Sequence, residues 1–176
     1  MSAFDTCLAF TLREEGGAVN NPHDPGGFTF RGVTLATFRW WTGNPAATSD
    51  DLLAISDDAL AALYGGLYWN PINGGALPPA VAMLVFDFAT NAGPRRSAML
   101  LQQAVGTEQD GSIGPITLAA VASDNTTFLV GRLAQLRADY YRSLTALFPT
   151  FGRGWIARTN ACEAAAIALL PLDPGA

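Results

Sequence analysis

The stretch that decides the fold reads Glu15-Gly16-Gly17-Ala18-Val19-Asn20-Asn21-Pro22-His23-Asp24-Pro25-Gly26-Gly27-Phe28-Thr29-Phe30-Arg31-Gly32-Val33-Thr34. A helical pattern precedes it, from Phe4 to Glu15. Glycine and proline interrupt its middle, and residues 28–31 alternate apolar and polar side chains. This order predicts a helix, a loop and then a short β-hairpin. One carboxylate, Glu15, therefore ends a helix directly before the only β element that we expect.

Glu15 lies on the apolar face of that first helix. On a wheel of about 100° per residue, the stripe contains Phe4, Leu8 and Leu12. Glu15 falls within the stripe, whereas Glu14 falls beside it. An apolar setting and a helix C-terminus both favour the protonated form of a carboxyl, which suits a general acid. The alternative is an ordinary helix-end residue with Gly16 as its C-cap.

The composition excludes several classes of protein. The chain has 176 residues, 49% of them hydrophobic, and a net charge of −5. Its basic residues are all arginine and form no stripe, so we expect no nucleic-acid partner. Asp, Pro or Gly breaks each long apolar run, so we expect no membrane insertion. The N-terminus lacks the basic start of a signal peptide, which predicts synthesis in the cytoplasm.

The metal-ligating residues are few. Cys7, Cys162 and His23 are too few for a structural zinc site, and we expect neither a metal nor a cofactor. The two cysteines are expected to be buried free thiols. A disulfide between them is the alternative in an oxidising compartment.

Helical patterns fill the rest of the chain. We expect helices in residues 35–41, two starting near 49 and 56, and others in 80–90, 94–105, from 115, 125–146 and 154–170. The fold class is therefore mainly α (α+β), with one small hairpin after the first helix. We expect residues 1–85 to form a half that contains the hairpin. Residues 86–170 are expected to form a helical second lobe packed into the same fold.

One polar residue, Asp87, lies within the apolar helix expected in residues 80–90, and a second, Asn91, lies just beyond its end. Asp87 and Asn91 are one helical turn apart and share a face, and in apolar surroundings they need partners. Either they line a cleft floor, or Asp87 holds the hairpin through Arg31. The second interpretation is the one we favour from the sequence.

The stretch from Glu15-Gly16-Gly17 to Gly32-Val33-Thr34 resembles the signature of glycoside hydrolase family 108. These are the N-acetylmuramidases of phage endolysins and bacterial secretion activator proteins. One departure is Asn21, where many relatives carry Asp. The second half is similar to the predicted peptidoglycan-binding region that usually follows, through these motifs: Tyr68-Trp69, Phe86-Asp87, Asn91-Ala92-Gly93-Pro94, Leu101-Gln102, Val105-Gly106, Asp110-Gly111, Ile113-Gly114-Pro115 and Thr117-Leu118.

The resemblance implies a lysozyme-like fold and hydrolysis of the β-1,4 bond between N-acetylmuramic acid and N-acetylglucosamine in peptidoglycan. It makes Glu15 the catalytic acid. Asp24 is the expected second carboxylate, and Thr29 a hydroxyl that positions water or stabilises the transition state. Alternatively, Asp24 is an Asx-turn residue and Thr29 a plain β-former. We expect substrate contacts from Thr34, Tyr68, Trp69 and Asn91.

Two other functions stay open on the sequence. One is a lytic transglycosylase, and the other is a non-catalytic peptidoglycan-binding component of a phage particle or a secretion system. In either case peptidoglycan is the expected partner and the protein is expected to be a monomer. Because the wall lies outside the cytoplasm, we expect release to the periplasm through a holin or a secretion channel.

Overall fold

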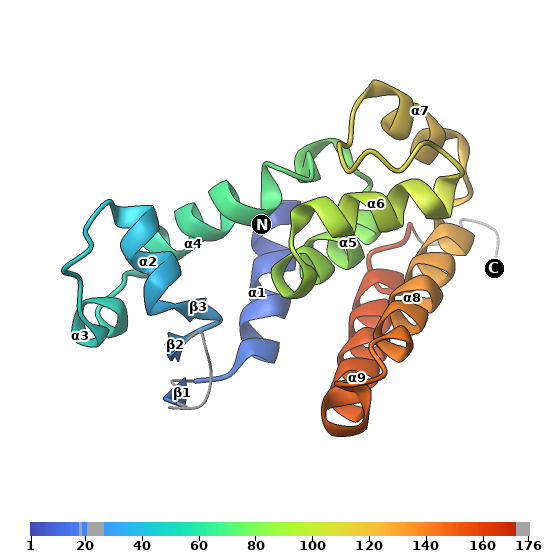
Figure 1. Cartoon of the computed structure of the whole chain (residues 1–176). Helices are drawn as coiled ribbons and strands as arrows, with labels where there is room; N and C mark the ends of the chain where they lie inside the picture. Colours follow the sequence, from blue (N-terminus) through green and yellow to red (C-terminus); the bar gives the residue numbers. More distant parts are fainter. Residues whose placement is uncertain (18, 21–26, 172–176) are drawn as a thin grey trace. The chain divides into compact units, whose positions relative to one another are not determined.

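The structure is a computed structural model that describes residues 1–17, 19–20 and 27–171 (Figure 1). The chain forms two compact units. Residues 8–65 make up the hairpin unit, and residues 1–7 with 66–176 make up the helical unit. The expected mainly helical fold, with a small β element directly after the first helix, is confirmed. The expected division between residues 85 and 86 stays a prediction.

The hairpin unit contains most of α1 (Ala3–Glu15) and the three short strands β1 (Val19–Asn20), β2 (Phe28–Phe30) and β3 (Val33–Thr34), which pair antiparallel in chain order. The helices α2 (Leu35–Thr42), α3 (Ser49–Leu53) and α4 (Asp57–Tyr64) follow. Each begins at a side chain that accepts a bond from a free backbone N–H: Thr34, Thr48 and Ser56. These caps explain why the helices begin where the sequence pattern places them.

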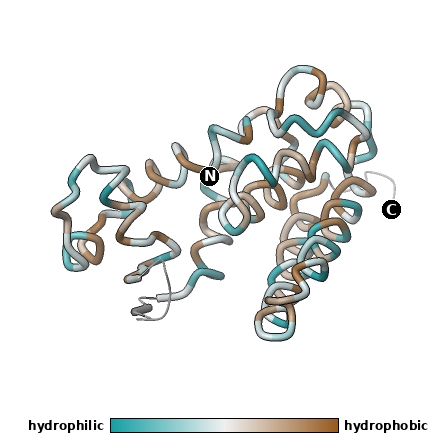
Figure 2. Tube along the Cα trace, viewed as in Figure 1, coloured by the Kyte–Doolittle hydropathy of each residue, from teal (hydrophilic) through white to brown (hydrophobic). Residues whose placement is uncertain are grey.

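The helical unit consists of η1 (Gly65–Trp69), which begins at the boundary between the units, η2 (Gly74–Ala76), α5 (Pro79–Ala92), α6 (Pro94–Val105), α7 (Pro115–Ser123), α8 (Thr126–Ser143) and α9 (Phe148–Ile167). The central helix α5 packs against α6, α8 and α9 (Figure 1). Every residue from Ala80 to Ala89 is buried. In Figure 2, by contrast, α8 and α9 carry both hydrophobic and hydrophilic residues along their length. This is the pattern of helices with one face on a core and one in water.

A polar turn joins α6 to α7. Gln102, buried on α6, donates through Nε2 to Asp110 Oδ1 at 2.6 Å and to Ser112 O at 3.0 Å. Its Oε1 accepts from Gly111 N at 2.9 Å. One amide therefore satisfies donors and acceptors of the turn and fixes it to α6.

The carboxylate of Asp87 joins three helices of this unit. It lies on α5, is fully buried, and contacts Arg137 of α8 at 2.7 Å and Arg158 of α9 at 2.7 Å. Arg158 also donates through Nε to both carboxylate oxygens. A buried carboxylate needs such partners, because desolvation of the charge is otherwise costly.

The two arginines determine the direction in which the pKa of this carboxylate is shifted. Burial acts to raise the pKa of Asp87, but the charges and hydrogen bonds of Arg137 and Arg158 outweigh it and lower the pKa below its ordinary value. A lowered folded-state pKa contributes stability above the ordinary value of about 3.9. That contribution is lost as the pH falls through the folded-state pKa.

These pairs overturn our interpretation that Asp87 holds the hairpin through Arg31. Arg31 pairs instead with Asp57 of α4, at 2.6 Å within the hairpin unit. The sequence revealed that Asp87 needed a partner, but two arginines of distant helices provide it.

Cys7 and Cys162 are both buried and free, as expected from their helical patterns. Burial, with a smaller effect of Asp87, raises the pKa of Cys7 to about 12. Burial also raises the pKa of Cys162. Both are therefore protonated thiols at neutral pH.

Among the described residues, no helix is long and apolar enough to cross a membrane.

We predict that Asp87→Asn lowers the free energy of unfolding by about 3–5 kcal/mol, because it leaves two arginines buried without their counter-charge. The difference from wild type should shrink as the pH falls below about 3.9, where the carboxyl of the unfolded chain takes up a proton, and it should be lost only below the lowered folded-state pKa of Asp87. Urea denaturation at several pH values measures both effects. Asp139→Asn is the control, because Asp139 pairs with Arg142 on the surface. Equal stability of Asp87→Asn and Asp139→Asn would contradict the role of the buried cluster.

Candidate active site around Glu15

Glu15 is the last residue of α1 and is half-buried. Gly16 follows it with φ 71°, the left-handed conformation typical of a residue that ends a helix. The Glu15 side chain lies against Gly32 of the hairpin. A Cβ atom placed on Gly32 would be 2.8 Å from Cγ and 2.9 Å from Cδ of Glu15. The carboxyl group at the end of the first helix therefore lies beside the hairpin turn.

The turn between β2 and β3 consists of Arg31 and Gly32. Both have positive φ, at 49° and 77°, as a two-residue type I′ hairpin turn requires. Tyr64 at the end of α4 donates its hydroxyl proton to Arg31 O at 2.8 Å. A Cβ on Gly32 would also be 2.4 Å from this hydroxyl oxygen. Glycine is therefore required at position 32 for its conformation and for the space around it.

Tyr64 and Glu15 approach the hairpin turn at the same residue. Tyr64 is only 1% exposed, so its ring is no platform for a ligand. Its role is to hold the turn that faces the carboxyl. The sequence analysis did not single out Tyr64, and the only local signal for its contact is the glycine at position 32 of the turn.

Thr29 and Thr34 are brought together by the sheet. They are direct partners across the antiparallel pair of β2 and β3, so their side chains project from the same face. Thr34 Oγ1 also caps α2, where it accepts from Thr37 N at 3.1 Å and lies 2.9 Å from Thr37 Oγ1. The roles of both hydroxyls in a reaction stay predictions. Asp24, the expected second carboxylate, lies outside the described residues.

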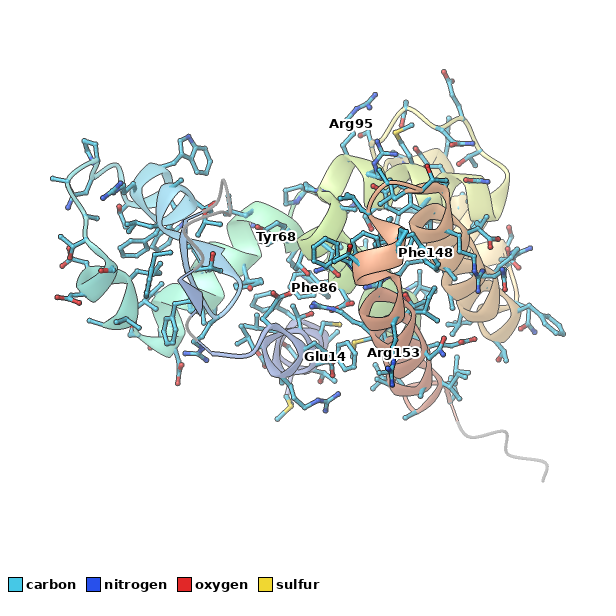
Figure 3. The ribbon with its side chains drawn as sticks, turned by 60° about the horizontal axis from the view of Figure 1, so that its bottom comes forward. Glu14, Tyr68, Phe86, Arg95, Phe148 and Arg153 are labelled. Atoms are coloured by element: carbon cyan, nitrogen blue, oxygen red, sulfur yellow. The ribbon has the colours of Figure 1, made fainter. Side chains whose placement is uncertain are left out.

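Glu14 and Glu15 differ in their contacts more than in exposure. Glu14 lies beside Glu15 near the end of α1 (Figure 3), and its side chain is only 25% exposed. It pairs with the exposed Arg13 at 3.4 Å. Of the two glutamates, Glu15 is the one whose side chain lies against the hairpin turn. This contact, and not burial, distinguishes it as the candidate acid.

The other predicted substrate contacts lie in the helical unit. Trp69 of η1 packs its ring against Phe4 and Phe86, with centroid distances of 5.3 and 5.6 Å. Tyr68 beside it is half-buried. Asn91 Oδ1 accepts from Arg137 at 3.1 Å and from Tyr141 at 3.4 Å. A substrate contact by any of these three residues stays a prediction.

The described residues contain no group of three or more His, Cys, Asp or Glu side chains that could hold a metal ion. The chemistry available at the hairpin turn is that of a carboxyl beside a hydroxyl. Such a pair can transfer a proton to or from a bound molecule.

We predict that Gly32→Ala lowers the free energy of unfolding by about 2–4 kcal/mol, from left-handed strain and from collision with Glu15 and Tyr64. The matched control is Gly27→Ala. Gly27 also has a positive φ, but a Cβ there meets no atom of the described residues within 4 Å. The control should therefore lose only the strain, about 1 kcal/mol. Urea denaturation measures both variants, and equal losses would show that the close approach at Gly32 costs nothing.

Comparison with known proteins identifies the family of the chain. The family model described as glycosyl hydrolase 108 matches residues 8–93, which include Glu15 and the hairpin. A second model, described as a predicted peptidoglycan domain, matches residues 96–160. No curated protein sequence matches. Among solved structures, the chain is similar to SagA of Brucella abortus, with 36% identity, a TM-score of 0.85 and coverage of 94% of each chain. The chain belongs to the glycosyl hydrolase 108 family and is a glycoside hydrolase with a C-terminal predicted peptidoglycan domain.

Proposed function

We propose that the protein is a lysozyme-type N-acetylmuramidase. It hydrolyses the β-1,4 bond between N-acetylmuramic acid and N-acetylglucosamine in bacterial peptidoglycan. The observation that carries the proposal is the Glu15 carboxyl held against Gly32, next to the Tyr64 hydroxyl. Family membership supports the reaction class, and the predicted peptidoglycan domain supports the substrate.

In this proposal Glu15 is the general acid. It protonates the glycosidic oxygen as the bond to the muramic acid breaks and an oxocarbenium-like centre develops. The turn that faces it is fixed by one hydrogen bond from the buried Tyr64. A fixed acid loses no orientation freedom on reaching the transition state, which favours proton transfer.

The second role is the delivery of water to the anomeric carbon. We propose Asp24 for the carboxylate that activates water or stabilises the cationic transition state, with Thr29 as a hydroxyl that helps to orient the water. Thr29 supports this because it lies in the strand that leads into the turn beside Glu15. Thr34 shares its sheet face and is a second hydroxyl for the substrate.

We predict that Glu15→Gln folds normally and loses at least about a hundredfold in the rate at which purified peptidoglycan releases reducing ends. Glutamine keeps the size of the side chain and cannot donate an acidic proton. Glu14→Gln is the matched control and should keep its rate, since Glu14 contacts Arg13. Mass spectrometry of the released fragments completes the test.

The outcomes separate the candidate functions. Reducing muramic acid ends support the muramidase. 1,6-Anhydro ends would identify a lytic transglycosylase, which uses one acid and no water. Binding to peptidoglycan without any release of fragments would identify a non-catalytic wall protein. Full activity of Glu15→Gln would remove Glu15 as the acid.

We also propose that the protein acts as an endolysin-like enzyme, made in the cytoplasm and delivered to the wall in the periplasm by a holin or a secretion channel. We predict that a bacterial culture expressing the protein lyses only when a holin is co-expressed. Turbidity of matched cultures measures this, with Glu15→Gln plus holin as the control for pore damage alone. Lysis without the holin would contradict this route.

A further inference from the structure

An open groove lies between α6 and α8 of the helical unit (Figure 1). Side chains of α6, of α8 and of the turn after α6 line it, together with the buried Phe88 of α5. Its volume is about 290 Å³, at the small end of the range for ligand sites, so it takes one unit of a polymer and not a long segment. All of these residues belong to one compact unit, so the groove is a feature of the helical unit alone.

Half-buried apolar side chains form one part of the lining. Leu136 and Tyr140 lie one turn apart on α8, and Met99 and Leu100 lie on α6. Each keeps part of its surface in water. A ligand with apolar surface of its own would cover these side chains, and the release of water favours binding.

Arg96 of α6 has a fixed place at the groove. Its Cζ lies over the Tyr140 ring, 5.1 Å from the centroid, in a favourable contact between a cation and an aromatic face. The ring is held in turn by an edge contact with Phe88, at 5.3 Å between centroids. In the part of the chain that the structure describes, no acidic side chain pairs with Arg96. A ligand therefore meets a guanidinium that is positioned and has donors to offer.

Two amides stand beside this guanidinium, from Gln103 of α6 and Gln109 of the following turn. Neither side chain bonds to another of the described residues, so a ligand displaces only water from them. The turn that carries Gln109 is fixed, because the buried Gln102 donates to the adjacent Asp110 at 2.6 Å. An amide donates and accepts at once, and so does a sugar hydroxyl.

The charges on the lining are of opposite sign. Its described residues include one cation, Arg96, and one anion, Asp139. Asp139 accepts from Gln135 at 3.0 Å and from Arg142 at 2.8 Å, and these bonds lower its pKa below the ordinary value. The carboxylate therefore stays charged at neutral pH. A lining with one charge of each sign suits a neutral polar ligand better than an ion.

We propose that this groove binds the glycan strand of peptidoglycan through one N-acetylhexosamine unit. Such a unit is neutral, and it combines hydroxyls and an acetamido group with apolar C–H and methyl surface. The polar groups match Arg96, Gln103 and Gln109, and the apolar surface matches Leu136 and Tyr140. The stem peptides of the same polymer, by contrast, carry free carboxylates. The inference rests on the proposed function, because it takes peptidoglycan as the ligand.

The test uses a methionine of the groove as its reporter. The chain has three methionines, Met1, Met83 and Met99. Met99 lines the groove, whereas Met83 is buried on α5 and is 2% exposed. Full-length Glu15→Gln with labelled methionine methyl groups is titrated with a tetramer of N-acetylglucosamine and followed by NMR. The Met99 signal, assigned with Met99→Leu, should shift, and the Met83 signal should stay.

Two further substitutions, each added to Glu15→Gln, test the polar contacts. Arg96→Gln takes the guanidinium off the Tyr140 ring and should weaken binding about threefold to tenfold, as should Gln103→Ala. Both residues are exposed, so the fold should be kept. Arg153→Gln is the matched control: it removes an exposed arginine of α9 outside the lining and should leave the affinity unchanged (Figure 3).

The choice of ligand separates the parts of the polymer. A tetramer of glucose, which lacks acetamido groups, should shift the Met99 signal less, and a synthetic stem peptide should not shift it. Raised salt should change the binding of the neutral sugar little. Equal responses to the two sugars, a response to the peptide in place of the sugar, or full affinity of Arg96→Gln would overturn the inference.

Release of reducing ends from purified peptidoglycan is measured separately, with the wild-type Glu15 in place. A Met99 signal that no sugar moves, together with normal release, overturns the glycan groove and leaves the proposed hydrolysis standing. A shifted Met99 signal without any release overturns the proposed hydrolysis and supports the groove.

Discussion

The helical unit depends on one buried carboxylate. Asp87 is fully buried on α5, and it is shared by Arg137 of α8 and Arg158 of α9. Apolar packing alone can hold these helices together, but it does not fix how far one helix turns or slides against another. Two arginines that converge on one carboxylate fix both. The price is the desolvation of three charges, which only good geometry repays.

The hairpin unit depends on a steric constraint and not on charge. At Gly32 a carboxyl and a phenol hydroxyl approach a backbone that carries no side chain. The distance between helix end and hairpin turn is thereby set by van der Waals contact and one hydrogen bond, Tyr64 to Arg31 O. Such a contact resists displacement in both directions. It suits a proton donor, whose reach must be held to a fraction of an ångström.

The sequence predicted those elements whose formation depends on residues close together in the chain. The helix that ends at Glu15, the hairpin after it and the caps near residues 49 and 56 depend on neighbours a few residues apart. The partners of Asp87 were missed because they come from helices far along the chain. The buried face of α8 shows the same limit: Arg137 and Tyr141 are buried, whereas the neighbouring Leu136 and Tyr140 are only half-buried. A charged residue such as arginine is expected on the exposed face of a helix. Arg137 is buried because it pairs with the buried Asp87.

The two units therefore fix their functional groups by different means. At Gly32 the constraint is made by backbone geometry and lies within the segment matched by the glycosyl hydrolase 108 model. At Asp87 the constraint is electrostatic, and its arginines lie in the segment matched by the predicted peptidoglycan domain. Because Asp87 itself precedes that segment, the C-terminal helices would lose their shared carboxylate if separated from α5. The segment matched by the predicted peptidoglycan domain thus takes the counter-charge of its two buried arginines from a residue in the segment matched by the glycosyl hydrolase 108 model.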